Sequence, residues 1–191
     1  MMDETTLAHY RMLADSLLGS AFPNGDDRII GGMLRGIGYF DAPASKGHHL
    51  AENGGLLAHS VNVTQRLVDL SVAWRVAWPR VESPYIVGML HDLVKCRCYR
   101  AVSGELPAWE YVQPEYPGHG ACSVAIAAEL GIQLMREEIA AITFHMGTFG
   151  IGKEYTEKEF YAAMNAFSSQ IVATHAADWY AASVDEKEVA G

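Results

Sequence analysis

The chain has 191 residues, of which 50% are hydrophobic and 19% are charged, a length that suits one domain with a complete hydrophobic core. Its formal net charge of −9 disfavours broad binding to nucleic-acid backbones, because that mode requires clustered Lys and Arg. No apolar run approaches the ~18 residues of a membrane span. The acidic segment 1–6 lacks the basic and apolar blocks of a signal peptide, so the expected location is the cytoplasm.

Hydrophobic periodicity predicts helices along nearly the whole chain. The first two are expected at 5–18 and 26–34, and a loop rich in glycine follows at 35–49. The later helices are expected at 55–74, 83–97, 118–130, 135–146 and 165–183. Between two of them, the segment 98–117 alternates around Ser103 and Gly104, which is the pattern of a short β-hairpin.

These elements predict an all-α fold, a helical bundle with a short β-hairpin insertion. No internal repeat or linker-like composition divides the chain, which favours a single domain over 1–191. Its N-terminal helices and loop are expected at 1–46, its core at 47–183, and a frayed tail at the charged stretch 184–191.

The dipeptide His91-Asp92 lies inside an apolar stretch that runs from Tyr85 to Lys95. This stretch is apolar on nearly all sides of a helix, as expected for a central, buried element. An unpaired buried aspartate is so costly that it is almost never found without a partner or a metal. The sequence therefore predicts that Asp92 has a partner among the other polar side chains that face the core.

Several titratable side chains fall on apolar helix faces: His59, His91, Asp92, His119, His145 and Asp178. His59, for example, shares a stripe with Leu56 and Val63, and His145 shares one with Met135, Ile139 and Ile142. A single such histidine is more often a hydrogen-bonded core residue than a ligand. Six titratable groups cannot be satisfied separately inside one small domain without many unpaired polar atoms, whereas a metal centre satisfies them together. Imidazole with carboxylate suits iron, manganese, cobalt, nickel or zinc rather than calcium.

At these residues the chain resembles the HD-domain superfamily of metal-dependent phosphohydrolases, whose signature runs His, His-Asp, Asp. The matching positions here are His59, His91-Asp92 and Asp178, and the branch with two intervening histidines is matched by His119 and His145. The strings at 40–45, 49–62 and 175–178 look like the HD domain of bacterial 3′-5′ exoribonucleases and their stand-alone relatives. The chain departs from the family pattern at Asn53 and Ala58, and it has no OB-type pattern for holding single-stranded RNA.

The resemblance implies an HD-domain bundle with one or two divalent transition-metal ions (Fe, Mn, Ni, Co or Zn, with Mg as an alternative). The first ion would be held by His59, His91, Asp92 and Asp178, and Asp92 would bridge to a second ion held also by His119 and His145. Asp92, Lys95 and Asp178 would be the catalytic residues, with Lys95 neutralising a phosphate; the alternative for Lys95 is a solvated charge. His49 is a second candidate for phosphate contact. Trp109, on the expected hairpin, is a candidate for stacking on a base, with core packing as the equal alternative.

The function expected from this resemblance is cleavage of a phosphate ester or phosphodiester, preferably of a nucleotide, by metal-activated water. A small phosphorylated ligand is the expected partner; no membrane is expected, extended nucleic acid is disfavoured, and the oligomeric state is left open. The alternatives are a 3′-5′ nuclease on short RNA or DNA, and a regulatory HD module that binds a nucleotide without turnover. An interaction scaffold without metal, and an HD branch that cleaves its substrate oxidatively, also remain open.

Overall fold

The computed structural model describes residues 2–47, 50–102, 108–114 and 118–186. Its fold is all-α with one short antiparallel hairpin, as the sequence predicts. The helices are α1 (Glu4–Ala21), α2 (Asp26–Gly36), α3 (Gly55–Ala73), α4 (Ser83–Leu90), α5 (Lys95–Cys98), α6 (His119–Glu129), α7 (Arg136–Thr143) and α8 (Glu157–Tyr180). The strands are β1 (Tyr99–Val102) and β2 (Ala108–Tyr111), and a 3-10 turn η1 (Gly147–Gly150) and a π-helix η2 (Ala181–Asp185) complete the order.

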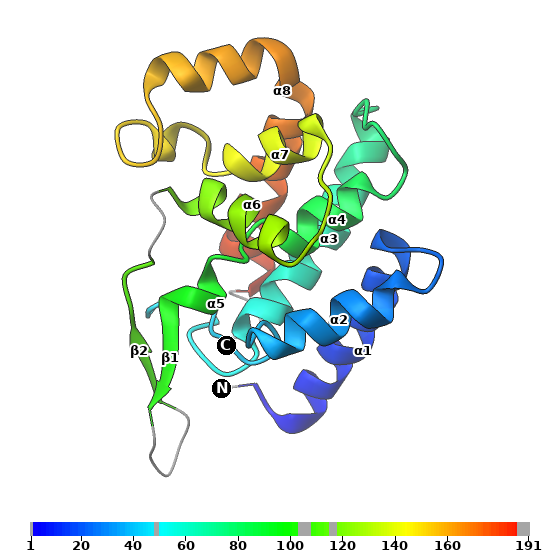
Figure 1. The fold of residues 1–191 in the computed structure, drawn as a ribbon, viewed down its shortest axis with the longest axis vertical. Helices are drawn as coiled ribbons and strands as arrows, with labels where there is room; N and C mark the ends of the chain where they lie inside the picture. Colours follow the sequence, from blue (N-terminus) through cyan, green and yellow to red (C-terminus); the bar gives the residue numbers. More distant parts are fainter. Residues whose placement is uncertain (1, 48–49, 103–107, 115–117, 187–191) are drawn as a thin grey trace.

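Helices α3 and α4 lie side by side at the centre of the bundle (Figure 1). Nearly the whole apolar surface of α4 is buried, as expected for a central helix. The two helices approach closely at Gly88, where an added Cβ would lie 2.6 Å from the Cα of Thr64. Helix α3 also packs against α1 and α8, and this arrangement brings the N-terminal part of α3 and the C-terminal half of α8 to the end of α4.

The hairpin projects away from the helices (Figure 1). Tyr99 pairs with Tyr111 in its register, and the two tyrosine rings meet edge to face with centroids 5.8 Å apart. The predicted turn at Ser103 and Gly104 lies outside the described residues.

The predicted helix at 83–97 is wrong, because α4 ends at Leu90 and α5 begins only at Lys95. The amide of His91 still bonds four residues back, to Val87, but the amide of Lys95 bonds only three residues back, to the carbonyl of Asp92. The tighter spacing turns the backbone between the two helices. His91 and Asp92 therefore lie at a helix end rather than on a continuous helical stripe.

Helix α8 begins at Glu157 instead of the predicted 165. Its start is a capping box: the amide of Glu159 donates to the Thr156 hydroxyl (3.2 Å), and the amide of Thr156 donates to the Glu159 carboxylate (2.7 Å). The helix is interrupted at Phe167, whose φ of −136° and ψ of 29° are non-helical, so the predicted start lies close to this kink.

The expectation of a frayed tail from Val184 is wrong for residues 184–186. The π-helix η2 carries the chain on to Glu186, which is only 3% exposed. Asp185 accepts two hydrogen bonds from Arg66 of α3, at 2.9 and 2.6 Å. Residues 187–191 lie outside the described part of the chain.

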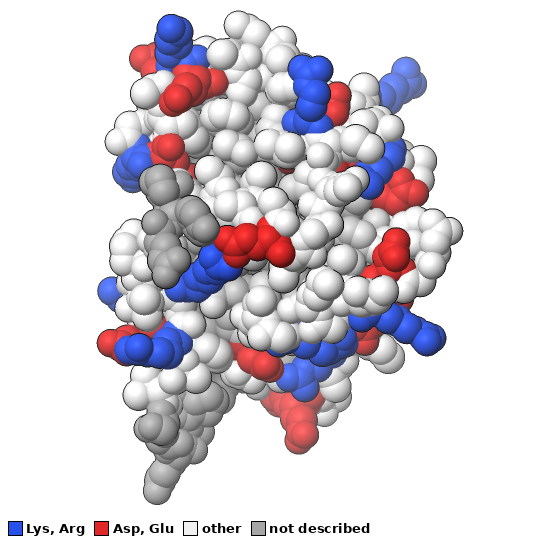
Figure 2. Space-filling model, in the orientation of Figure 1, with Lys and Arg blue, Asp and Glu red and all other residues white. Residues whose placement is uncertain are grey.

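Cationic and anionic side chains are interspersed on the face shown in Figure 2. Surface ion pairs of the structure include Arg35 with Asp15 at 2.7 Å and Arg100 with Glu110 at 2.7 Å. Among the described residues, none of the helices has both the length and the apolar content needed to cross a membrane.

Candidate metal centre

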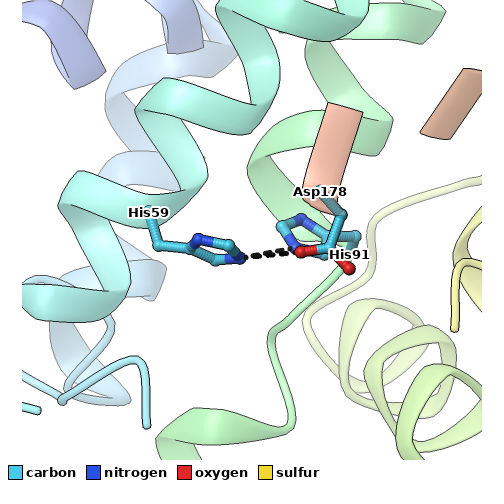
Figure 3. Close-up of side chains that lie close together, drawn as sticks. All are labelled: His59, His91 and Asp178. Atoms are coloured by element: carbon cyan, nitrogen blue, oxygen red, sulfur yellow. Dashed lines mark hydrogen bonds and ion pairs between the residues drawn. The ribbon is translucent and has the colours of Figure 1, made fainter. Parts of the chain in front are cut away.

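The structure brings all six predicted ligands together around Asp92. They come from five segments: the N-terminal part of α3, the end of α4 and the turn after it, the start of α6, the turn after α7, and the C-terminal half of α8. His59, His91 and His145 are each at most 1% exposed, and Asp92 is 6% exposed. Figure 3 shows His59, His91 and Asp178 converging from three of these segments.

Two groups of ligand atoms each lie within 4.8 Å of one another: His59, His91 and Asp178, and His91, Asp92 and His145. In the first group, the Nε2 of His59 lies 3.3 Å from the Nε2 of His91 and 3.2 Å from the Oδ1 of Asp178. Two ligands about 2.1 Å from one tetrahedral ion are about 3.4 Å apart. The spacing of these side chains is therefore the spacing that one shared ion requires.

Asp92 presents one carboxylate oxygen to each side of the cluster. Its Oδ2 lies 3.7 Å from the Nε2 of His59 and 3.7 Å from the Nε2 of His91. Its Oδ1 lies 3.7 Å from the Nε2 of His145 and also contacts the Nε2 of His119. Such a carboxylate, with a pair of imidazoles at each oxygen, can bridge two ions.

The histidine tautomers are fixed by acceptors on the far side of each ring. The Nδ1 of His91 donates to the carbonyl of Gly88 at 2.8 Å, and the Nδ1 of His145 donates to the carbonyl of Ile142 at 2.7 Å. On His59 the Nδ1 faces the Glu186 carboxylate at 2.8 Å. A proton on Nδ1 leaves the Nε2 lone pair free, and all three Nε2 atoms point into the cluster. This donor set fits a divalent metal ion.

The buried imidazoles of the metal-free protein differ in pKa, because burial dominates for two of them and nearby carboxylates dominate for the third. Burial lowers the pKa of His91 to about 4 and also lowers the pKa of His145, so both rings are neutral at pH 7. Burial would lower the pKa of His59 as well, but hydrogen bonds to Asp178 and Glu186 raise that pKa to about 10. A neutral imidazole is the form that binds a metal, and His59 must therefore lose a proton when it does so.

The two aspartates stay ionised. Burial would raise the pKa of Asp178, but the hydrogen bond and positive charge of His59 lower it. Burial would also raise the pKa of Asp92, but the electrostatic interaction and hydrogen bond with His119 and the positive charge of Lys95 hold it well below its ordinary value. The cluster thus provides two carboxylates that need no deprotonation before they bind an ion.

A cavity of about 320 Å³ opens onto this cluster. Lys95 lines it beside His59, Asp92, His119 and Asp178. Burial would lower the pKa of Lys95, but the negative charge of Asp92 raises it above its ordinary value. Lys95 is therefore a cation inside the cavity, within reach of whatever binds at the cluster.

The other two candidates for substrate contact are not placed at this cavity. His49 lies outside the described residues. Trp109, on β2, packs against the hydrophobic core and does not belong to the described residues that line the cavity. The aromatic side chains that do line it are Phe149 and Trp179.

Glu186 is the residue of the site that sequence reasoning missed. It lies in a run of charged residues, a pattern that ordinarily indicates a solvated tail. A signal was available, since Asp178, Ala182 and Glu186 follow each other at four-residue spacing and so continue the inward stripe of α8. His175 also supports the site: its Nδ1 donates to the carbonyl of His145 at 2.7 Å.

Comparisons with models of protein families, with curated proteins and with solved structures give no match. The geometry of the cluster therefore carries the functional argument.

Proposed function

We propose that this protein is a metal-dependent phosphohydrolase of the HD class that cleaves a phosphate ester or phosphodiester of a nucleotide. The observation that carries the proposal is the position of Asp92, whose two oxygens face two pairs of imidazoles and which lines one cavity together with Lys95. A buried carboxylate of this kind with a nearby cation fits a site that holds metal ions and a phosphate.

One or two divalent transition-metal ions (Fe, Mn, Co, Ni or Zn), when bound, supply Lewis-acid polarisation of a phosphoryl oxygen and lower the pKa of a coordinated water. His59, His91, Asp92 and Asp178 would hold the first ion, and Asp92, His119 and His145 the second. Mg²⁺ is the less favoured ion, because it prefers oxygen ligands and this cluster is rich in imidazole.

The residues of the chain then have separate roles. Lys95 neutralises negative charge on the phosphate, and its ammonium is kept protonated by Asp92. Asp178 lines the cavity with its side chain 20% exposed, so its carboxylate can accept a hydrogen bond from the attacking water and orient it. The buried rings of His91 and His145 exclude water from the inner side of the cluster.

The substrate in this proposal is small. The net charge of −9 and the mixed charges on the face in Figure 2 disfavour an extended nucleic acid, which is the substrate of the nuclease alternative. A cytoplasmic location is part of the proposal.

Metal analysis followed by activity assays tests this function. The purified protein should contain bound transition metal and should hydrolyse one class of phosphate ester in a screen of nucleotides with Mn, Fe, Co, Ni, Zn and Mg. His91→Ala and Asp92→Asn should lose both metal and turnover, while His9→Ala, on the exposed face of α1, should keep both.

Unchanged metal content in both cluster variants would overturn the metal assignment. Nucleotide binding without turnover under every metal would favour the regulatory module instead. Turnover that depends on oxygen and iron would favour oxidative cleavage.

A further inference from the structure

The cavity at the cluster has two chemically different parts. The inner part carries the histidines, the two aspartates and Lys95, while the outer part is lined by Met146, Phe149, Trp179 and Ala182. Phe149 is 62% exposed and Trp179 is 59% exposed. Single exposed aromatic residues are ordinary on protein surfaces, but these two come from different segments and line one cavity.

Phe149 is held by a tightly packed turn. Gly147, which begins η1, has a φ of +57°, and an added Cβ there would lie 3.0 Å from the His175 ring. The Tyr155 hydroxyl donates to the carbonyl of Gly147 at 2.6 Å. The Phe149 ring itself lies 6.3 Å from the His175 ring, measured between centroids. The turn is therefore built to hold an aromatic ring beside the cavity instead of burying it.

Trp179 is held by α8, the helix that provides Asp178. It follows His175 by one helical turn, so both side chains lie on the face of α8 that borders the cavity. Ala177 and Ala181 are fully buried, whereas Trp179 and Tyr180 are exposed, and of these two aromatic residues Trp179 is the one that lines the cavity. A substrate whose phosphate reaches Asp178 would pass beside this indole.

We propose that Phe149 and Trp179 form a stacking site for the base of a nucleoside monophosphate. The inference rests on the proposed function, which places the phosphate at the cluster, and adds the two residues that would bind the base. The flat faces of nucleobases stack on aromatic side chains in a way that tolerates every base.

Size and charge limit the ligand to one nucleotide unit. A volume of about 320 Å³ lies at the lower end of the range for small-molecule sites, about 300–1,000 Å³. Lys95 is the one Lys or Arg among the described residues that line the cavity. The protein side chains therefore offer charge for one phosphate group and none for a polyphosphate chain.

Binding of analogues that resist hydrolysis tests the stacking site independently of turnover. The probes are the 5′-methylenephosphonates of adenosine, guanosine, cytidine and uridine, with the methylenephosphonate of ribose as the control that lacks a base. Calorimetry with metal-loaded protein should show at least one nucleoside analogue binding about tenfold or more tightly than the ribose analogue, a difference of about 1.4 kcal/mol that lies within what one stacked base contributes.

Trp179→Ala and Phe149→Ala should each weaken the nucleoside analogue by about fivefold or more and leave the affinity for the ribose analogue and the metal content unchanged. Trp179→Phe should retain most of the preference for the base. Trp74→Ala removes a tryptophan that is 49% exposed at the end of α3 and should have no effect.

The stacking site is overturned if all four nucleoside analogues bind no more tightly than the ribose analogue, if none of the five binds, or if both alanine variants keep the base preference. A base preference without turnover of any phosphate ester would instead refute the phosphohydrolase proposal and leave the stacking site standing.

Discussion

Replacing Glu186 tests whether the buried carboxylate behind His59 sets the metal affinity of the cluster. Its Oε1 lies 2.8 Å from the Nδ1 of His59, and the residues Glu186 and His59 are 3% and 1% exposed. Glu186→Ala removes this acceptor and its charge, so the ring loses the contact that fixes its tautomer. Removing such an outer partner of a metal ligand weakens metal binding by about 10–100-fold, or about 1.4–2.7 kcal/mol.

Glu186→Gln should have a smaller effect than Glu186→Ala, because the amide oxygen can still accept the Nδ1 proton although the charge is gone. The metal dissociation constant, measured by competition with a coloured chelator, gives the comparison directly. The matched control is Asp185→Asn, which weakens the neighbouring pair with Arg66 and leaves Glu186 in place. We expect this control to change metal affinity by less than about threefold, since partly exposed ion pairs contribute about 0–1 kcal/mol.

Two results would refute this reasoning. Wild-type metal affinity in Glu186→Ala would show that the carboxylate does not tune His59. An equal loss in Asp185→Asn and Glu186→Ala would show that both variants simply loosen the C-terminal helix.

Three further predictions address packing, protons and phosphate. Gly88→Ala should lower the melting temperature by about 2–12 °C, because its Cβ would meet Thr64 across the α3–α4 contact and overpacking costs about 1–3 kcal/mol; an unchanged melting temperature would contradict the close approach. Metal binding at pH 7–8 should release about one proton, since the raised pKa of His59 (about 10) keeps it protonated in the metal-free protein, and this release should fade as the pH rises through 10. Calorimetry in two buffers of different ionisation enthalpy measures the number of protons released. If no proton is released at pH 7–8, His59 is not protonated in the metal-free protein. Lys95→Met should lower kcat/KM by about tenfold or more without loss of metal; equal turnover in the variant would leave Lys95 as a solvated charge.

Much of the fold was predictable because its helices are amphipathic. His59 lies on the inward stripe of α3 with Leu56 and Val63, and all three are buried as the periodicity predicts. The hairpin was predictable from alternation around a turn. The helix faces and the hairpin can both be predicted because each depends on the local order of apolar and polar residues, which is the signal that periodicity measures.

The site was harder to predict where its ligands lie at helix ends. The proposed stripe of Met135, Ile139, Ile142 and His145 is wrong at its first two positions, which are 48% and 38% exposed, whereas Ile142 and His145 are buried. His145 follows the end of α7 and is turned inward by the bond from its Nδ1 to Ile142. The direction of a side chain beyond a helix end depends on tertiary contacts, which helical periodicity does not report. His145 was therefore predicted correctly as a core-facing residue, but from a helical stripe that does not extend to it.

The distance in sequence between His59 and Glu186 determines when the cluster can be completed during synthesis. During synthesis, His59 leaves the ribosome long before its partners Asp178 and Glu186, which lie 119 and 127 residues further along the chain. The nascent chain can already pack α1, α3 and α4 against one another through their apolar faces. His91 and Asp92 then lack the contacts of α8, because that helix has not yet been synthesised. We expect a nascent chain that lacks Asp178 and Glu186 to bind metal far more weakly than the chain that contains them.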